Sequence, residues 1–231
     1  MELASPDAPQ AAAGRMTPMD PARADRLQSL GVVPYRLRAP TTSVDQPWET
    51  LKAEVARCTR CALCDSRTQT VFGTGALDAE LVVVGEAPGA EEDRRGEPFV
   101  GRAGQLLDAM LLAAGWAREQ VFIANVLKCR PPGNRDPSAE EIERCLPYLG
   151  RQLQSLAPRA VLCVGRVAAQ ALLATDVPIG RLRGRVHAGP GGLPLVVTYH
   201  PAYLLRSPGE KAKSWADLEL RRAPRGLRRG G

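Results

Sequence analysis

The chain has no uninterrupted apolar run of the roughly 18 residues that a membrane-spanning helix needs. Its N-terminus also lacks a basic region followed by an apolar core, which is the pattern of a secretory signal. We therefore expect a cytoplasmic protein with no membrane partner. Histidine and aromatic residues are scarce, since the 231 residues include only 2 His and 3 Phe. A histidine or phenylalanine at a candidate site is therefore especially informative.

The residues that are abundant favour a folded protein with an anionic partner. Hydrophobic residues make up 44% of the chain, which is ample for a core. The formal net charge of +6 favours polyanions such as nucleic acid. Basic surfaces also occur without such a partner, so the charge supports this interpretation only weakly. We expect the protein to act as a monomer.

The chain divides into three regions. Residues 1–45 are rich in Pro, Ala, Asp and Arg with little periodicity, which predicts a mostly disordered N-terminal extension. A docking arm for a partner protein is the alternative. Residues 46–220 are predicted to form the folded domain. Residues 221–231 read RRAPRGLRRGG, and we interpret them as a basic, solubilising C-terminal tail, with a phosphate-contacting arm as the alternative.

Strand-like apolar runs alternate with helical patterns through the middle of the chain. This alternation predicts an α/β fold with a parallel sheet and right-handed crossovers. Ser138 with Glu141 three residues later is a capping box, which predicts a helix start and puts Cys145 two turns into that helix. The predicted strands are 81–84, 121–126, 160–164 and 195–199, and the predicted helices lie near 103–114, 138–156, 166–174 and 210–220.

The segments that follow the four strands carry the most chemistry. They are Gly85–Gly89, Asn125–Pro132, Gly165–Arg166 and His200–Pro201. In a parallel sheet the carboxyl ends of the strands meet at one edge, where such sheets bind ligands. A Gly-rich loop, an amide, a basic segment and a histidine are thus predicted to face one crevice. The alternative is that these residues only make turns.

Six cysteines stand at positions 58, 61, 64, 129, 145 and 163. Cys163 lies in a predicted buried strand, where a free cysteine acts as a small apolar residue. The run 58–64 has the pattern CxxCxxC in a polar segment, which favours metal binding over disulfides in a cytoplasmic protein. Zinc and an iron-sulfur cluster both accept four thiolates. The spacing favours a cluster but does not decide between Cys61 and Cys64.

Several long motifs, in order, resemble the type-4 uracil-DNA glycosylases, the iron-sulfur branch of the uracil-DNA glycosylase superfamily. The motifs are GEAPG, PFVGRAGQLL, NVLKCRPPGNR and HPAYLLR, and the resemblance spans about residues 50–220. It implies a three-layer α/β/α sandwich, here around a four-stranded, mainly parallel sheet. It also implies a [4Fe-4S] cluster and hydrolysis of the bond between uracil and deoxyribose in DNA, which leaves an abasic site for repair.

The resemblance also implies a role for individual residues. Phe99 would stack on a uracil flipped out of single- or double-stranded DNA, Asn125 would read its O4 and N3–H, and His200 would donate to O2. Glu86 is the nearest carboxylate for water activation, because Ala87 stands where some superfamily members have an acidic residue. The family's cluster ligands fall on Cys58, Cys61, Cys129 and Cys145, and its uracil pocket on Gly85, Glu86, Ala87, Phe99, Asn125 and His200.

Two further assignments follow from the resemblance. Glu92 is a candidate for excluding thymine beside uracil C5, with a solvated surface charge as the alternative. Leu204 and Leu205 are candidates for an apolar wedge and Arg206 for a phosphate contact, although the two leucines are equally consistent with a buried helix.

Other functions for the same fold remain open from the sequence. These are a non-catalytic or covalent uracil-DNA binding protein and an iron-sulfur redox or regulatory protein. The covalent branch of the superfamily carries an Arg-rich insertion with a reactive histidine, and none is found between Lys128 and Arg135.

Overall fold

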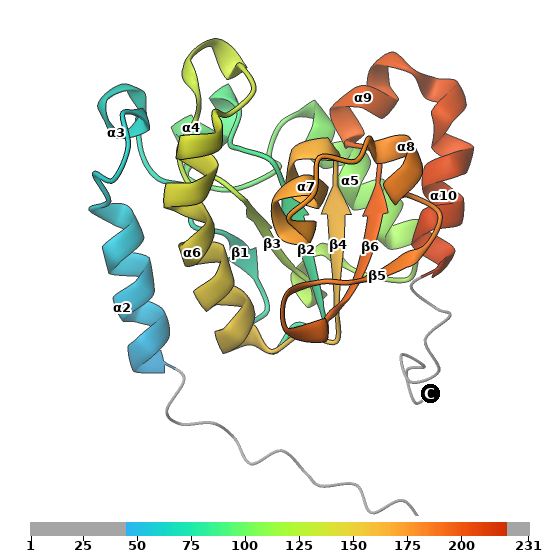
Figure 1. Ribbon diagram of the computed structural model, residues 1–231, viewed down its shortest axis with the longest axis horizontal. Coiled ribbons are helices and arrows are strands. Elements are labelled where there is room, and N and C mark those ends of the chain that lie inside the picture. The colour runs from blue at the N-terminus through green and yellow to red at the C-terminus, as the bar shows by residue number, and fades with distance from the viewer. Residues whose placement is uncertain (1–44, 221–231) are drawn as a thin grey trace, which may run out of the picture. The chain divides into compact units, whose positions relative to one another are not determined.

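The four predicted apolar runs form the parallel centre of one sheet in the computed structural model, which describes residues 45–220. The sheet order is β1-β3-β2-β4-β6-β5, so the arrows of the central strands point the same way in Figure 1. The strands are β1 (Thr74–Gly75), β2 (Leu81–Gly85), β3 (Phe122–Asn125), β4 (Ala160–Val164), β5 (Val186–Ala188) and β6 (Pro194–Thr198).

The sheet has six strands, and the prediction of four was wrong. The additional strands β1 and β5 are two and three residues long and pair antiparallel with the outer parallel strands. Neither strand contains a continuous apolar run. Strand β1 is half-exposed and β5 lies largely in solvent, so neither needs one. They become strands by hydrogen-bonding to the free edges of β3 and β6. A hydrophobic pattern along the chain therefore does not reveal them.

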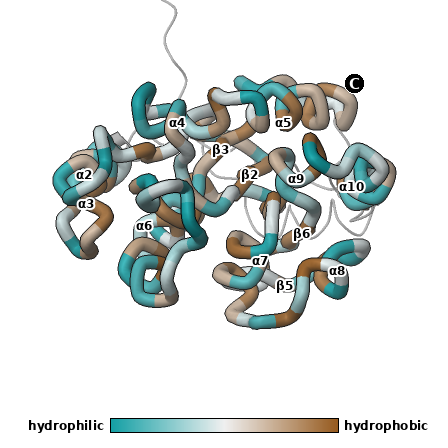
Figure 2. The backbone as a smooth tube through the Cα atoms, turned by 90° about the horizontal axis from the view of Figure 1, so that it is seen from above, coloured by the Kyte–Doolittle hydropathy of each residue, from teal (hydrophilic) through white to brown (hydrophobic). Residues whose placement is uncertain are grey.

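Helices cover both faces of the sheet. Val82 and Val84 of β2 pack in one apolar cluster with residues of α2, α6 and α7, whereas Leu81 and Val83 pack in a second cluster with α5 and α10. The view from above in Figure 2 shows α6 and α7 on one side of the strands and α5 on the other. Because side chains alternate along a strand, a fully apolar strand such as β2 supplies both clusters.

The helices agree closely with the periodicity of the sequence. The capping box at Ser138 is present, with Ser138 Oγ accepting from Glu141 N at 3.2 Å and Ser138 N donating to Glu141 Oε2 at 2.8 Å. Helix α2 has no counterpart in the prediction, although Trp48, Leu51 and Val55 form its buried face. The helices are α2 (Asp45–Ala56), α3 (Leu63–Ser66), α4 (Ala90–Arg95), α5 (Arg102–Ala113), α6 (Ala139–Leu156), α7 (Arg166–Leu173), α8 (Ile179–Leu182), α9 (Pro201–Arg206) and α10 (Lys211–Leu220).

Short 3₁₀ turns lie at Arg118–Gln120, Pro132–Asn134, Pro190–Gly192 and Pro208–Glu210. Across residues 45–220, every helix is too short or too polar to cross a membrane. The expected N-terminal extension (residues 1–45, of which 45 begins α2) and the basic tail (221–231) lie outside the described residues.

Candidate functional site

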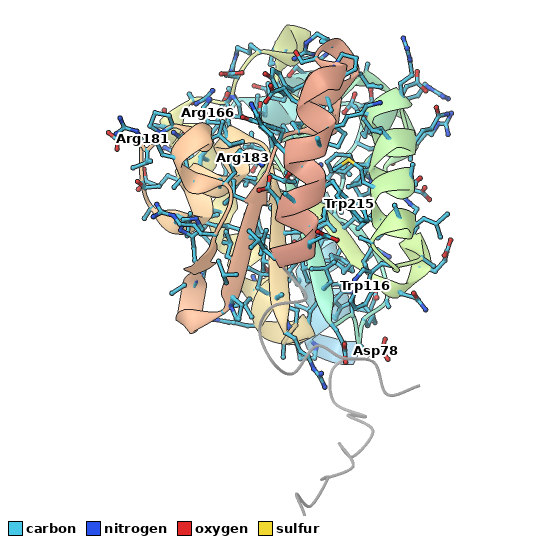
Figure 3. All side chains as sticks on the ribbon, turned by 90° about the vertical axis from the view of Figure 1, so that its right-hand side faces the viewer. Asp78, Trp116, Arg166, Arg181, Arg183 and Trp215 are labelled. Carbon is cyan, nitrogen blue, oxygen red and sulfur yellow. The ribbon has the colours of Figure 1, made fainter. Side chains whose placement is uncertain are left out.

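A cavity of about 470 Å³ opens at the carboxyl edge of the parallel strands. In Figure 3 the label of Arg166, which follows β4, marks this edge of the sheet. The label of Asp78, which precedes β2, marks the opposite edge. The walls come from the segments after β2, β3 and β6, as the sequence predicts, whereas Gly165 and Arg166 do not line the cavity. The lining residues include Glu86, Ala87, Pro88, Gly89, Glu92, Phe99, Asn125, Pro131, Asn134, Arg135, His200, Tyr203 and Arg206.

Gly85 provides space for two side chains of the cavity wall without lining the cavity itself. A Cβ atom at Gly85 would lie 2.4 Å from Asn125 Oδ1 and 2.6 Å from Phe99 Cζ, closer than real Cβ atoms approach their neighbours. Gly85 also pairs with Asn125 across β2 and β3. A side chain at this position would therefore displace both Phe99 and Asn125, which explains why β2 ends with glycine.

Asn125 is 2% exposed and ends β3. Its Oδ1 is a buried acceptor with no hydrogen-bond partner in the structure. A buried polar atom without a partner costs free energy, and such atoms in native proteins usually mark a missing ligand or water. The amide of Asn125 is therefore in place to bind a donor that enters the cavity.

His200 lies against Phe99 with a ring-centroid distance of 5.7 Å and an angle of 30° between the ring planes. Its Nδ1 accepts from Ala202 N at 3.1 Å, so the neutral ring carries its proton on Nε2. Burial, assisted by the positive charge of Arg206, lowers the pKa of His200 to about 4. At neutral pH the ring is therefore an uncharged Nε2–H donor in the cavity wall.

The low pKa of His200 predicts a pH-dependent stability. The unfolded chain protonates this histidine near pH 6.5 and the folded chain only near 4, so the free energy of unfolding falls as pH drops between these values. At about 1.36 kcal/mol per pH unit, the contribution is roughly 3 kcal/mol. Urea unfolding of the parent protein and of His200→Asn at pH 6.5 and at about 4 measures it. Equal losses in both proteins would contradict the assignment.

Glu86 lines the cavity next to Ala87, on the segment that follows β2. Burial raises the pKa of Glu86, and the negative charge of Asp136 raises it further, while Arg166 opposes both effects. Arg166 Nη2 donates to Asp136 Oδ2 at 2.5 Å, so these two charges form a pair beside Glu86. Glu86 is thus a carboxylate with a raised proton affinity, which is a property of general bases.

Glu92 is part of the cavity wall rather than a charge directed into solvent. Its Oε1 accepts from Val100 N at 3.0 Å and from Gly101 N at 3.2 Å. These bonds hold the turn after Phe99, whose φ of 54° lies in the left-handed region that side chains rarely adopt. The carboxylate of Glu92 therefore supports the conformation that presents the Phe99 ring.

Helix α9 follows His200 and separates its residues by exposure. Leu204 is fully buried and therefore cannot enter a DNA duplex, which corrects its assignment to an apolar wedge. Leu205 and Tyr203 are 38% and 37% exposed. Arg206 lines the cavity at the end of this helix. The exposed side of α9 thus combines two apolar side chains with a cation beside the cavity.

Four of the six cysteines line a second, smaller cavity. They are Cys58, Cys61, Cys129 and Cys145, together with cations that include Arg67 and Lys128. Arg67 Nη1 donates to Cys129 Sγ at 3.2 Å, and Lys128 N donates to Cys145 Sγ at 3.2 Å. These donors match the needs of thiolate ligands, whose sulfur atoms accept hydrogen bonds and carry negative charge.

The other two cysteines lie apart from this cavity. Cys64 donates from its thiol to Asp65 Oδ1 at 3.3 Å on the exposed side of α3. Cys163 is fully buried in β4, as predicted, and burial raises its pKa. Within residues 45–220, no three Cys, His, Asp or Glu side chains converge closely enough to hold one metal ion. Cys58, Cys61, Cys129 and Cys145 nevertheless line the same small cavity.

Comparison with known proteins agrees with this geometry. The family model described as the uracil DNA glycosylase superfamily matches residues 72–219. The type-4 uracil-DNA glycosylase of Archaeoglobus fulgidus is 46% identical over 173 residues, which cover 72% of this chain and 87% of the relative. The type-4 enzyme of Thermotoga maritima is 41% identical over 183 residues, covering 74% and 95%. The chain belongs to the type-4 uracil-DNA glycosylases. A type-5 enzyme of Pyrobaculum aerophilum is more distant, at 33% identity over 168 residues and 64% of this chain.

Two features of this type-4 glycosylase were missed by sequence reasoning. Asn134 and Arg135 line the cavity from the turn after Pro131 and Pro132. Asn134 has a φ of 55°. The PPGN sequence is typical of a tight turn and could have indicated that Asn134 lies in one. Lys128 is 1% exposed, whereas a lysine in a basic segment is expected in solvent. No local sequence pattern predicts that Lys128 is buried.

Proposed function

We propose that this protein excises uracil from DNA by hydrolysing the N-glycosidic bond, releasing free uracil and leaving an abasic site for repair. The observation that carries the proposal is the buried Oδ1 of Asn125, which lacks a partner in the wall of a cavity that also holds Phe99 and His200. The fold we propose is the family's three-layer α/β/α sandwich, with the helices on the two faces of the sheet as its outer layers. We expect it to act as a cytoplasmic monomer.

The side chains of the cavity match the edges of uracil. Asn125 Oδ1 accepts from uracil N3–H, and the NH₂ of the same amide donates to O4. Cytosine presents an acceptor at N3 and a donor at C4, so the same amide rejects it. The ring of Phe99 supplies the stacking surface for the flipped base. Recognition therefore rests on an amide whose own oxygen has no partner until the base enters.

The reaction requires stabilisation of uracil as a leaving anion. The neutral His200 donates from Nε2 to uracil O2, where negative charge grows as the glycosidic bond breaks. Backbone amides of the segment Gly85–Gly89 add donors near the same charge. The sugar becomes oxocarbenium-like, and water attacks its anomeric carbon. The proton of that water goes to Glu86, whose raised pKa suits it as a general base.

Replacing Glu86 with glutamine tests this last role. Because the carboxylate must be deprotonated to accept a proton, the parent rate should fall at acidic pH with a midpoint above that of an ordinary glutamate. Glu86→Gln should be slower by about 10²-fold at neutral pH and should lose this acid limb. The measurement is the single-turnover rate on a uracil oligonucleotide between pH 4 and 8. An unchanged acid limb in the variant would assign the base elsewhere.

Glu92 is proposed to exclude thymine. Its carboxylate is held by Val100 N and Gly101 N, so it forms a fixed wall that the C5 methyl group of thymine would meet. Glu92→Ala should release thymine from a G·T pair and should slow uracil release about tenfold through the loosened Phe99 turn. Glu92→Gln keeps an acceptor for the two amides and serves as the matched control. A Glu92→Ala protein that still ignores thymine would remove the exclusion role.

The four cysteines Cys58, Cys61, Cys129 and Cys145 are proposed to hold a [4Fe-4S] cluster. All four line one cavity, and Arg67 and Lys128 supply donors to the sulfurs of Cys129 and Cys145. A bound cluster would link the segment between α2 and α3 to the segment after β3 and to α6. Its proposed role is structural.

DNA contacts are proposed for the exposed side of α9. Leu205, with Tyr203 beside it, would fill the gap left by the flipped base, and Arg206 would bind a phosphate. Arg206 then acts both on the backbone of DNA and, through its charge, on the pKa of His200.

One assay tests the function against its alternatives. The protein is incubated with an oligonucleotide that contains uracil, in single-stranded form and in U·G and U·A duplexes, and is then treated with alkali. Strand scission indicates a glycosylase, and a permanent protein-DNA adduct indicates a covalent trap. Retention of intact DNA without scission indicates a non-catalytic binder. The absence of all three indicates an iron-sulfur redox or regulatory protein.

A further inference from the structure

Lys128 is a lysine in the interior of the protein. It is 1% exposed and among the largest fully buried side chains in the described residues. The ammonium group of lysine has three hydrogen-bond donors and no acceptor. A buried charge is costly unless polar groups surround it. The partners of Lys128 therefore indicate why the charge is kept there.

The ammonium group bonds to two neutral oxygens. Lys128 Nζ donates to Gln152 Oε1 at 2.6 Å and to the backbone O of Asn125 at 2.8 Å. Gln152 is fully buried in α6, and its Nε2 donates to the backbone O of Phe72 at 2.9 Å. The amide of Gln152 thus has a fixed orientation, and it holds the ammonium against Asn125.

The bond to Asn125 fixes one peptide group on both sides. This peptide joins Asn125 to Val126, and its N–H donates to Gly85 O at 3.0 Å while its C=O accepts from Lys128. A peptide held by both of its polar groups cannot rotate freely. Its orientation sets the direction of the Asn125 side chain, whose Oδ1 has no partner in the cavity wall.

The same residue also contacts the cysteine site. Its backbone N donates to Cys145 Sγ at 3.2 Å, and Cys129 follows it in the chain. Lys128 therefore contacts the cysteine site through its backbone N–H and the backbone carbonyl of Asn125 through its side chain.

We propose that Lys128 is a positioning residue for base recognition, which holds the Asn125 peptide in the orientation that reads uracil and joins it to the cysteine site. The inference rests on the proposed function of Asn125. A merely structural lysine would stabilise the fold and affect all DNA substrates alike. A positioning lysine affects the preference for uracil over cytosine.

The test compares Lys128→Met with the full-length parent, both carrying their iron. Methionine keeps most of the volume of the side chain and removes the donors. The probes are two oligonucleotides that resist cleavage, one with 2′-fluoro-2′-deoxyuridine and one with 2′-fluoro-2′-deoxycytidine. The measured quantities are the two dissociation constants and the iron content. We expect the uracil-to-cytosine affinity ratio to fall by about tenfold or more, with the affinity for the cytosine probe unchanged.

Two further variants complete the experiment. Lys52→Met makes the same substitution at an exposed lysine of α2 and should leave the ratio unchanged. Gln152→Met removes the second partner of the ammonium and should lower the ratio by a smaller factor, which keeps the test valid if Lys128→Met does not fold.

An unchanged ratio in an iron-loaded Lys128→Met or Gln152→Met protein would overturn the proposal. Equal weakening of both probes, or loss of iron in both variants, would also overturn it by assigning Lys128 to structural support. A parent protein with no preference for the uracil probe would instead refute the proposed function of Asn125.

Discussion

Replacing His200 with alanine should lower the single-turnover rate of uracil release by about 10² to 10³-fold, the usual effect of removing one donor to a developing anion. The reason is the fixed tautomer of this ring. Nδ1 accepts from Ala202 N, so Nε2 carries the only ring proton. Because burial keeps the pKa of His200 at about 4, the donor is neutral throughout the physiological range. The rate should be measured on single-stranded uracil DNA, where the cost of opening a base pair is absent.

The chain provides a matched control for this experiment. Its other histidine, His187, lies in β5 and has Nε2 2.5 Å from the backbone O of Leu182, outside the cavity. His187→Ala should therefore release uracil at the parental rate. A His200→Ala protein that retains the parental rate would show that leaving-group stabilisation comes from other donors, with the backbone amides of the Gly85–Gly89 segment as the remaining candidates.

Removing the iron should lower the melting temperature by about 10 °C. The four cysteines lie in the segment between α2 and α3, in the segment after β3 and in α6, which are distant in the sequence. A cross-link that closes loops of this kind contributes about 2–4 kcal/mol, and 1 kcal/mol corresponds to about 2–4 °C in a domain of this size. Chelation followed by thermal unfolding measures the effect. An apo protein with the melting temperature of the parent would contradict the structural role.

Single substitutions make the same test without a chelator. Cys129→Ala should lose iron and show the lowered melting temperature, because Cys129 lines the cysteine cavity and accepts from Arg67 Nη1. Cys64→Ala should keep both properties, because the thiol of Cys64 bonds to Asp65 outside that cavity. Loss of iron from Cys64→Ala would reopen the choice between Cys61 and Cys64 as a ligand.

The predicted elements that form the centre of the fold are confirmed. Each depends on a short-range pattern, such as the apolar run of β4 or the capping box at Ser138 that begins α6. The two missed strands have a different cause. Strands β1 and β5 exist only because they pair with the edges of β3 and β6, and two or three residues are too few to show a period. Partner-dependent elements of this length cannot be found by patterns along one chain.

For the candidate site too, the sequence predicted some features and missed others. Glu86, Ala87, Phe99, Asn125 and His200 come together at one cavity, as the ends of parallel strands require. Gly85 does not line the cavity, and its contribution is the space that it leaves for Phe99 and Asn125. Leu204 is buried, because the first turn of α9 directs it inward. Sequence placed these residues in the correct segment, but the direction of each side chain depends on packing.

The sequence by itself determined the α/β class, the order of the central strands along the chain and the membership of the type-4 family. These properties depend on composition, periodicity and motif spacing, which are local. Only the tertiary structure decided the neutral state of His200, the partnerless Oδ1 of Asn125, the contact of Glu92 with the Phe99 turn and the burial of Lys128. Each of these depends on solvent exclusion or on hydrogen bonds between segments far apart in the chain, which no local pattern records.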